Sequence, residues 1–282
     1  MSDNSRAPAA AGDSGTRNLV TRAVTALVLA PLAIGIVYAG GWFWTVLVTA
    51  VSVGIFIEWL MIVGARDNLR VLGAGVGALA ITGLCLGFER YDGALPFALL
   101  GLVVVGYLGG EQRRWTASGY FYAAAALLAS VLVRADAEWG FAALMLVLLV
   151  VWAADIGGYF AGRTLGGPKL WPRVSPKKTW AGAIGGFVLG LCVASGFAVL
   201  GYGNWGPLLA LAALLSVVSQ LGDLFESAVK RQFGVKDSSQ IIPGHGGLMD
   251  RLDGYVAAVV AAALFGVARG GIEGAGRGLM MW

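Results

Sequence analysis

Charged residues are scarce in this sequence. Only 13% of its 282 residues are Asp, Glu, Lys or Arg, whereas soluble domains carry about 25%. Hydrophobic residues make up 58%, and the mean hydropathy is +0.77. This balance excludes an ordinary soluble domain and predicts an integral membrane protein.

Several features of soluble binding sites are also missing. The two cysteines, Cys85 and Cys192, both lie within apolar runs, which indicates neither a disulfide nor a cysteine metal cluster. The basic loops discussed below contain no Walker-type phosphate loop and no glycine-rich dinucleotide fingerprint, so soluble nucleotide-binding folds are not indicated. The net charge of +4 does not point to nucleic acid, and we expect no nucleic-acid partner. The 44 glycines are typical of closely packed membrane helices.

The N-terminal region divides into a polar tail and an apolar run. Residues 1–18 are small and polar, which predicts a disordered tail. The run at 19–39 competes with a secretory signal, but its uninterrupted part exceeds the roughly 7–15 residues of a signal core, and no convincing cleavage site follows. We therefore expect a first transmembrane helix there, and one polytopic membrane domain over residues 19–282.

Further apolar runs predict an all-α integral membrane protein with about nine transmembrane helices. The two shortest runs lie near the lower limit of roughly 17 residues for spanning, so the count can shift by one. The eight runs after the first are at 42–64, 71–88, 94–110, 117–133, 139–161, 181–202, 205–225 and 254–269.

Basic residues are distributed unevenly between the two sides that these spans define. With the tail inside, sixteen of the 20 Lys and Arg residues fall on the inner side. Such an excess marks the cytoplasmic side, so we expect a multi-pass protein of the cell (inner) membrane with a cytoplasmic N-terminus. The four basic residues outside are Arg90, Arg134, Arg269 and Arg277.

Three acidic residues fall within or at the ends of spans: Glu58, Asp155 and Asp223. An ionisable group at membrane depth is costly and therefore indicates function by default. Glu58 is the weakest case, because it can simply lie near the inner interface. Asp155 shares a helix face with Tyr159 and Arg163, but two turns separate it from that arginine, so it needs another partner.

The stretch 219–254 concentrates the charge that the rest of the chain lacks, together with the only histidine, His245. Read as a helix, Asp223, Glu226, Ser227 and Lys230 line one face. The charged residues of the stretch are Asp223, Glu226, Lys230, Arg231, Lys236, Asp237, Asp250, Arg251 and Asp253.

A loop of small residues at 243–247 follows and can bring backbone N–H groups close to a ligand. Asp250 and Asp253 then stand at the start of the next apolar run. Carboxylates, cations and a glycine loop beside apolar segments suggest a metal-assisted site for a phosphorylated ligand. The alternative is a solvated loop between helices.

The inner loop 162–180 has the composition of a phosphate site. Lys177 and Lys178 supply positive charge, and Ser175 and Thr179 offer hydroxyl groups on either side of them. The alternative is that these cations only mark the cytoplasmic side and attract anionic lipid headgroups, which charge alone favours.

The motifs of the second half resemble the signature of phosphatidate cytidylyltransferases, the CDP-diacylglycerol synthases. The matching segments are Ser227-x-x-Lys230-Arg231, Lys236-Asp237 and Pro243-x-His245-Gly246-Gly247-x-x-Asp250-Arg251-x-Asp253. Asp155 with Gly162-Arg163, the segment 175–180 and the segment 220–223 are also similar to family segments. The resemblance is strong over 145–260. One departure is Ala181, where the family usually has an acidic residue, so any role of that carboxylate is in doubt here.

The resemblance implies a nucleotidyltransferase that converts CTP and phosphatidic acid to CDP-diacylglycerol and pyrophosphate for phospholipid biosynthesis. It implies a Mg²⁺ requirement, with a second, monovalent cation such as K⁺ left open. It also implies a homodimer in the lipid bilayer, whose polar cavity faces the cytoplasm and opens laterally to lipid. Two alternatives stay open, a CTP-dependent polyprenol kinase and an ion-coupled transporter.

The resemblance also implies roles for individual residues. Asp223 and Asp250 would hold the metal, with Asp155 as a further ligand. His245 would bind phosphate or protonate the leaving pyrophosphate, or would instead hold the glycine loop in shape. The expected catalytic residues are Asp223, Asp250, Lys230, Arg231, His245 and Asp253. The expected substrate-binding residues are Ser175, Lys177, Lys178, Thr179, Ser227, Lys236, Asp237, Arg251, Gly246 and Gly247.

Overall fold

The computed structural model describes residues 31–239 and 246–282. The expected tail at 1–18, most of the first expected span at 19–39, and His245 lie outside the described residues. Within the described part, residues 31–39 are helical, and eight helices are long and apolar enough to cross a membrane. They are α2 (Gly41–Ile62), α3 (Leu69–Gly87), α4 (Tyr91–Leu108), α5 (Arg113–Ala135), α6 (Gly140–Thr164), α7 (Trp180–Val199), α8 (Trp205–Gln232) and α9 (Met249–Gly270).

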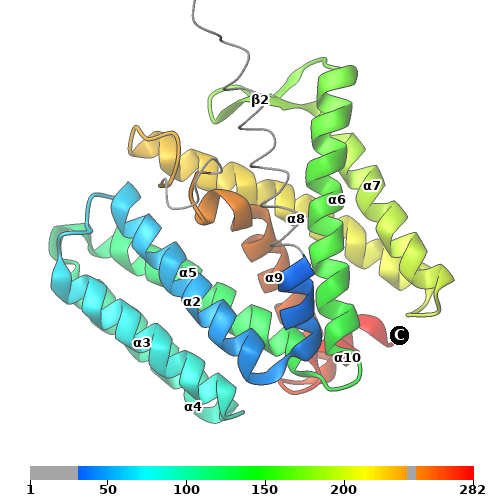
Figure 1. The fold of residues 1–282 in the computed structure, drawn as a ribbon. Helices are drawn as coiled ribbons and strands as arrows, with labels where there is room; N and C mark the ends of the chain where they lie inside the picture. The colour runs from blue at the N-terminus through cyan, green and yellow to red at the C-terminus, as the bar shows by residue number, and fades with distance from the viewer. Residues whose placement is uncertain (1–30, 240–245) are drawn as a thin grey trace, which may run out of the picture.

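The all-α membrane fold is therefore confirmed, and short elements complete it. They are the single-turn η1 (Gly110–Gln112), the strands β1 (Lys169–Trp171) and β2 (Ser175–Thr179), and the C-terminal α10 (Ala275–Met280). The two strands form an antiparallel hairpin within the expected basic loop 162–180. In Figure 1 this hairpin and the start of α9 lie toward one end of the molecule, while α10 lies toward the other.

Two helix bounds differ from the expected spans, and both differences matter for the site. The apolar run 205–225 continues as helix to Gln232, and α9 begins at Met249 rather than at residue 254. Charged residues at the end of a span can leave the hydrocarbon region while the backbone stays helical. The expected inner loop 226–253 is thus shorter, and its motif residues stand largely on the facing ends of two helices.

Glycines let α6 and α7 approach each other closely. A Cβ built on Gly182 would lie 2.8 Å from the backbone oxygen of Gly158, and one on Gly157 would lie 2.7 Å from that of Gly185. Small residues at such spacing are the usual means of close packing between membrane helices. The hairpin lies at the start of α7, because β2 ends at Thr179 and α7 begins at the next residue.

Aromatic side chains fill the space between α2 and α5. Trp59, Phe56 and Tyr120 are all completely buried, and the Trp59 indole donates a hydrogen bond of 2.8 Å to the Trp115 carbonyl oxygen. Phe56 and Tyr120 meet edge to face at 5.8 Å. This packing fixes α2 beside the helices that carry the polar residues of the second half.

Candidate active site

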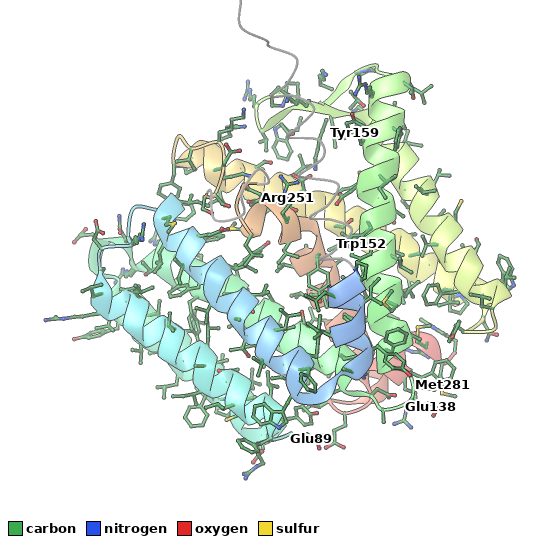
Figure 2. The ribbon with its side chains drawn as sticks, in the orientation of Figure 1. Glu89, Glu138, Trp152, Tyr159, Arg251 and Met281 are labelled. Atoms are coloured by element: carbon green, nitrogen blue, oxygen red, sulfur yellow. The ribbon has the colours of Figure 1, made fainter. Side chains whose placement is uncertain are left out.

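The charged residues of three helices gather around one polar cavity of about 430 Å³. Each contributing helix exposes its charge near the end that carries the hairpin and the start of α9, where Arg251 and Tyr159 are labelled in Figure 2. The lining residues are Asp155 from α6, Asp223 and Lys230 from α8, Asp237 from the loop, and Asp250, Arg251 and Asp253 from α9. All seven belong to segments that the sequence motifs single out.

Asp250 is held by a dense set of hydrogen bonds in the first turn of α9. Lys230 Nζ donates to Asp250 Oδ1 at 2.6 Å, while the backbone N–H groups of Ser238 and Gly247 each donate to Oδ2 at 3.0 Å. The Ser238 hydroxyl adds a further contact to Oδ2 at 3.0 Å. Backbone donors and a cation together stabilise the ionised carboxylate and fix its orientation.

Lys230 also connects Asp250 to a carboxylate for which the sequence analysis gave no role. Glu226 is completely buried one turn earlier on α8, and its Oε1 lies 3.2 Å from Lys230 Nζ. A buried lysine between two carboxylates offsets part of the cost of burying all three charges. The sequence feature that could have indicated a role for Glu226 is its position on the same helix face as Asp223 and Lys230.

Asp223 is engaged from the hairpin. Lys178 of β2 forms an ion pair with Asp223 Oδ2, and the Ser227 hydroxyl lies 3.4 Å from Oδ1. Asp155 and Asp223 also line a second cavity of about 370 Å³, together with Lys177, Lys178 and Thr179. The hairpin therefore brings its lysines to the carboxylates, as a phosphate-binding role for loop 162–180 requires.

Two glycines and one threonine among the remaining expected residues shape the local backbone. Gly246 has a φ of +84°, and Gly247 donates its backbone N–H to Asp250, so both shape the turn before α9. Thr179 caps α7, since its Oγ1 accepts a hydrogen bond of 3.1 Å from Gly182 N. The expected residues with described positions that line neither of the two polar cavities are Ser175, Ser227, Arg231, Lys236, Gly246 and Gly247.

The donor set can be compared with what a divalent cation requires. Asp155, Asp223, Asp250 and Asp253 offer carboxylate oxygens around one cavity, which is the chemistry that Mg²⁺ prefers. Among the described residues, however, no three His, Cys, Asp or Glu side chains converge closely enough to hold an ion as they stand. Lysines pair with both Asp223 and Asp250 instead. The residues thus fit a divalent cation in kind, with their charges balanced by lysine in this arrangement.

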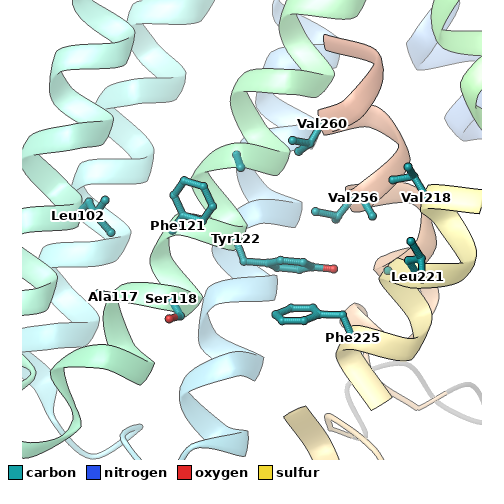
Figure 3. A pocket seen from close by; sticks show the side chains of 13 residues that line it. Leu102, Ala117, Ser118, Phe121, Tyr122, Val218, Leu221, Phe225, Val256 and Val260 are labelled. Carbon is teal, nitrogen blue, oxygen red and sulfur yellow. The ribbon is translucent and has the colours of Figure 1, made fainter. Parts of the chain in front are cut away.

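A large apolar cavity of about 620 Å³ lies among α4, α5, α8 and α9, whose side chains form its walls (Figure 3). Figure 3 shows the rings of Tyr122 and Phe225 next to each other in this lining. The Tyr122 hydroxyl lies 3.5 Å from the Asp253 carbonyl oxygen, and Gly222 lines the cavity immediately before Asp223. Polar and apolar lining residues thus follow each other along α8 and at the start of α9, an arrangement that suits a substrate with a charged head and apolar chains.

Comparison with known proteins reveals extensive similarity. A sequence model of the cytidylyltransferase family matches residues 20–268. The phosphatidate cytidylyltransferase of Brucella suis biovar 1 is 45% identical over 260 residues, which cover 88% of this chain and 93% of that protein. The protein of the same name from Pseudomonas aeruginosa is 38% identical over 266 residues, covering 87% and 96%. That of Bacillus subtilis is 44% identical over 121 residues, covering 42% and 45%.

Proposed function

Because the chain belongs to the cytidylyltransferase family, we propose that it transfers the cytidylyl group of CTP to phosphatidate. The products are CDP-diacylglycerol, which serves phospholipid biosynthesis, and pyrophosphate. The observation that carries this proposal is that α8 and α9 line both a cavity rich in carboxylates and cations and a large apolar cavity. That arrangement suits a nucleotide on one side and a lipid on the other.

The chemistry asks for positioning rather than for a strong base. A phosphate oxygen of phosphatidate bonds to the α-phosphorus of CTP, and the bond to the bridging oxygen breaks, so that its electron pair leaves with pyrophosphate. Phosphatidate is already ionised and nucleophilic, so alignment and charge neutralisation dominate. The cations around the two polar cavities supply that neutralisation: Arg163, Lys177, Lys178, Lys230 and Arg251.

A divalent metal, which we propose to be Mg²⁺, supplies further neutralisation of the triphosphate when it is bound. Asp223 and Asp250, with Asp155, are its proposed ligands, because all three face the same cavity. A second, monovalent cation such as K⁺ and a phosphate contact by His245 remain proposals from family resemblance. Lys178 and Lys230 pair with Asp223 and Asp250 and orient these two side chains.

The apolar cavity is the proposed site of the acyl chains of phosphatidate. Phe121, Leu221 and Val260 give it apolar walls that match acyl chains. The Tyr122 hydroxyl in its lining lies near the backbone of Asp253, a residue of the polar cavity. A lipid with its chains there would carry its phosphate toward Asp253 and Arg251. The aromatic side chains of Tyr122 and Phe225, whose centroids are 6.2 Å apart, would separate the two environments.

The setting of the enzyme follows from charge and from the family. We propose a cell (inner) membrane location with a cytoplasmic N-terminus, since sixteen of the 20 basic residues lie on one side of the spans. We also propose one membrane domain over 19–282, supported by the family match over 20–268. The homodimer rests on resemblance alone.

An assay with labelled CTP tests the function directly. With phosphatidate, Mg²⁺ and the detergent-solubilised protein, a label on the α-phosphate should enter the lipid, while a label on the γ-phosphate should leave as pyrophosphate. A polyprenol kinase would place the γ-label in lipid and release CDP, and a transporter would do neither. Transfer of the γ-label, or no transfer from either position, would contradict the proposal.

A further inference from the structure

Glu58 is a completely buried carboxylate that no step of the reaction above uses. It lies on α2, a helix whose other residues are almost all apolar, and its side chain has no exposed surface. Burying an ionised carboxylate is costly unless donors surround it. The contacts of Glu58 therefore indicate which part of the protein this buried carboxylate serves.

Four hydrogen bonds reach the Glu58 carboxylate, and all come from residues far along the chain. Oε1 accepts from the Ser239 hydroxyl at 2.5 Å and from Leu248 N at 2.8 Å. Oε2 accepts from the Ser238 hydroxyl at 3.0 Å and from Met249 N at 2.7 Å. The donors thus stand on both sides of the segment 240–245 in the sequence, and one carboxylate joins them.

Two of these donors are backbone groups at the start of α9. A helix begins with N–H groups that lack partners within the helix, and a side-chain acceptor usually satisfies them. Leu248 occupies the cap position and provides no such acceptor. Glu58 takes that role from another helix, and its negative charge lies at the positive end of the α9 dipole.

The same carboxylate reaches Asp250 through one intervening hydroxyl group. The Ser238 Oγ lies 3.0 Å from Glu58 Oε2 and 3.0 Å from Asp250 Oδ2, so that its single proton is shared between the two carboxylates and donated to one of them at a time. Gly247 fits beside this group because it has no side chain: a Cβ there would lie 2.9 and 3.0 Å from the two Glu58 oxygens. Gly247 also donates its N–H to Asp250. Glu58 therefore supports two of the donors that orient Asp250.

We infer that Glu58 is a positioning residue of the reaction, which acts through Ser238 and the first turn of α9 to hold Asp250 in the geometry that the transfer requires. The inference rests on the proposed function and adds to it a residue from the first half of the chain. A purely structural carboxylate would affect stability alone. A positioning residue also lowers the rate in protein that remains folded.

The test compares Glu58→Gln with a control of equal destabilisation. Gln keeps the shape but presents an amide group to two of the four donors, so α9 and Asp250 lose their fixed orientation. We expect kcat to fall by about 10–100-fold, with the KM for CTP within about twofold of wild type. Leu79→Ala, which removes a fully buried side chain on α3, should lower the melting temperature at least as much while kcat stays within about twofold.

Two further measurements keep the inference testable if Glu58→Gln proves too unstable. Ser238→Ala should lower kcat in the same direction, and in the double variant with Glu58→Asp the losses should be less than multiplicative, because both changes break one connection. Without added metal, hydrogen exchange of the peptide covering 247–252 should be faster in Glu58→Asp and Ser238→Ala than in Leu79→Ala.

The outcomes separate this inference from the proposed function. A wild-type protein that does not form CDP-diacylglycerol contradicts the function, whatever Glu58 does. An active wild type whose Glu58 and Ser238 variants keep kcat, or lose it only in proportion to melting temperature as Leu79→Ala does, contradicts the positioning role. Unchanged exchange at 247–252 in those variants contradicts it as well.

Discussion

Single side chains at the polar cavity are held by partners from other elements, and Asp250 shows this most clearly. Its four contacts come from α8, the loop and the turn before α9. Lys230 has a second carboxylate partner in Glu226 at 3.2 Å. Loss of the Asp250 charge therefore leaves the lysine paired, and stability and catalysis can be separated at this position.

Asp250→Asn should abolish most turnover while the protein still inserts and purifies. Asparagine keeps the shape but removes the charge that a metal needs, and we expect kcat to fall by at least about 100-fold. Measurement of kcat as a function of Mg²⁺ concentration, beside a thermal melt, checks this. Asp223→Asn should behave similarly, and Asp253→Asn more mildly. Near-normal Mg²⁺-dependent activity in both Asp223→Asn and Asp250→Asn would contradict the metal assignment.

Lys178 offers a prediction about CTP. Removal of its charge would delete the proposed phosphate contact, and it leaves Asp223 without its ion-pair partner, so that the unpaired carboxylate would repel the nucleotide. A charged contact contributes about 1.5 kcal/mol or more, so the KM for CTP should rise roughly tenfold in Lys178→Ala. The KM for phosphatidate should change by less than about twofold.

Lys177→Ala and Lys169→Ala provide the comparison for Lys178. Lys177 lines the second polar cavity and should share part of the effect, whereas Lys169 on β1 is an exposed lysine of the same hairpin and should have little. If Lys178→Ala and Lys169→Ala give the same kinetics, the hairpin lysines serve topology rather than substrate.

The residues that the sequence analysis passed over differ in how far along the chain their partners lie. Glu58 acts through contacts that the sequence cannot place, since it bonds residues about 190 positions away, whereas Glu226 pairs with Lys230 one turn along the same helix. Asp155, Asp223, Asp250 and Asp253 could be predicted because they are ionisable groups at membrane depth in recognisable motifs. A buried carboxylate in an apolar run is visible from sequence, but its partner is not.

At the scale of elements, hydrophobic runs predicted the eight described spans because their length alone matches a bilayer. They did not predict where α8 ends or where α9 begins, since charged residues extend both helices beyond the apolar runs. Nor did they predict the β1–β2 hairpin, whose short strands carry no clear alternation of polar and apolar residues. Boundaries and short strands depend on tertiary contacts, and those are invisible in a single run of residues.

The close pairing of α6 and α7 gives a prediction about packing. In Gly182→Ala the new methyl group would meet the Gly158 backbone oxygen at 2.8 Å. Because neither backbone can move freely, we expect a loss of about 1–3 kcal/mol in stability, measured as a lower melting temperature in detergent.

Gly196→Ala on the same helix is the matched control. A Cβ there meets nothing within 4 Å, and alanine is favoured over glycine in a helix by about 1 kcal/mol. The control should therefore melt at the same temperature or slightly higher. Equal melting temperatures for Gly182→Ala and Gly196→Ala would show that the two helices do not need their glycine contact.

For the molecule as a whole, the polar cavities and the charged residues that line them lie toward one end. The hairpin, the end of α8, the start of α9 and both polar cavities lie there, whereas α10 and the labelled residues Glu89, Glu138 and Met281 lie toward the other end in Figure 2. All four expected outer arginines have hydrogen-bond partners. Arg90 pairs with Asp92, Arg134 donates to the Val37 carbonyl, Arg269 donates to that of Gly278, and the backbone N–H of Arg277 donates to Asp136.

This polarity predicts which end faces the cytoplasm. CTP is available in the cytoplasm. The sixteen Lys and Arg residues expected on the inner side also favour a cytoplasmic position for the end that carries the polar cavities. In a Cys85→Ala/Cys192→Ala background, cysteine placed at exposed Asp67 or Gln232 should resist a membrane-impermeant thiol reagent added outside intact cells, and cysteine at exposed Glu273 should react. All three should react after the membrane is permeabilised, which controls for accessibility. Labelling of the Asp67 and Gln232 positions from outside, with protection at Glu273, would reverse the orientation and place the polar cavity where no CTP reaches it.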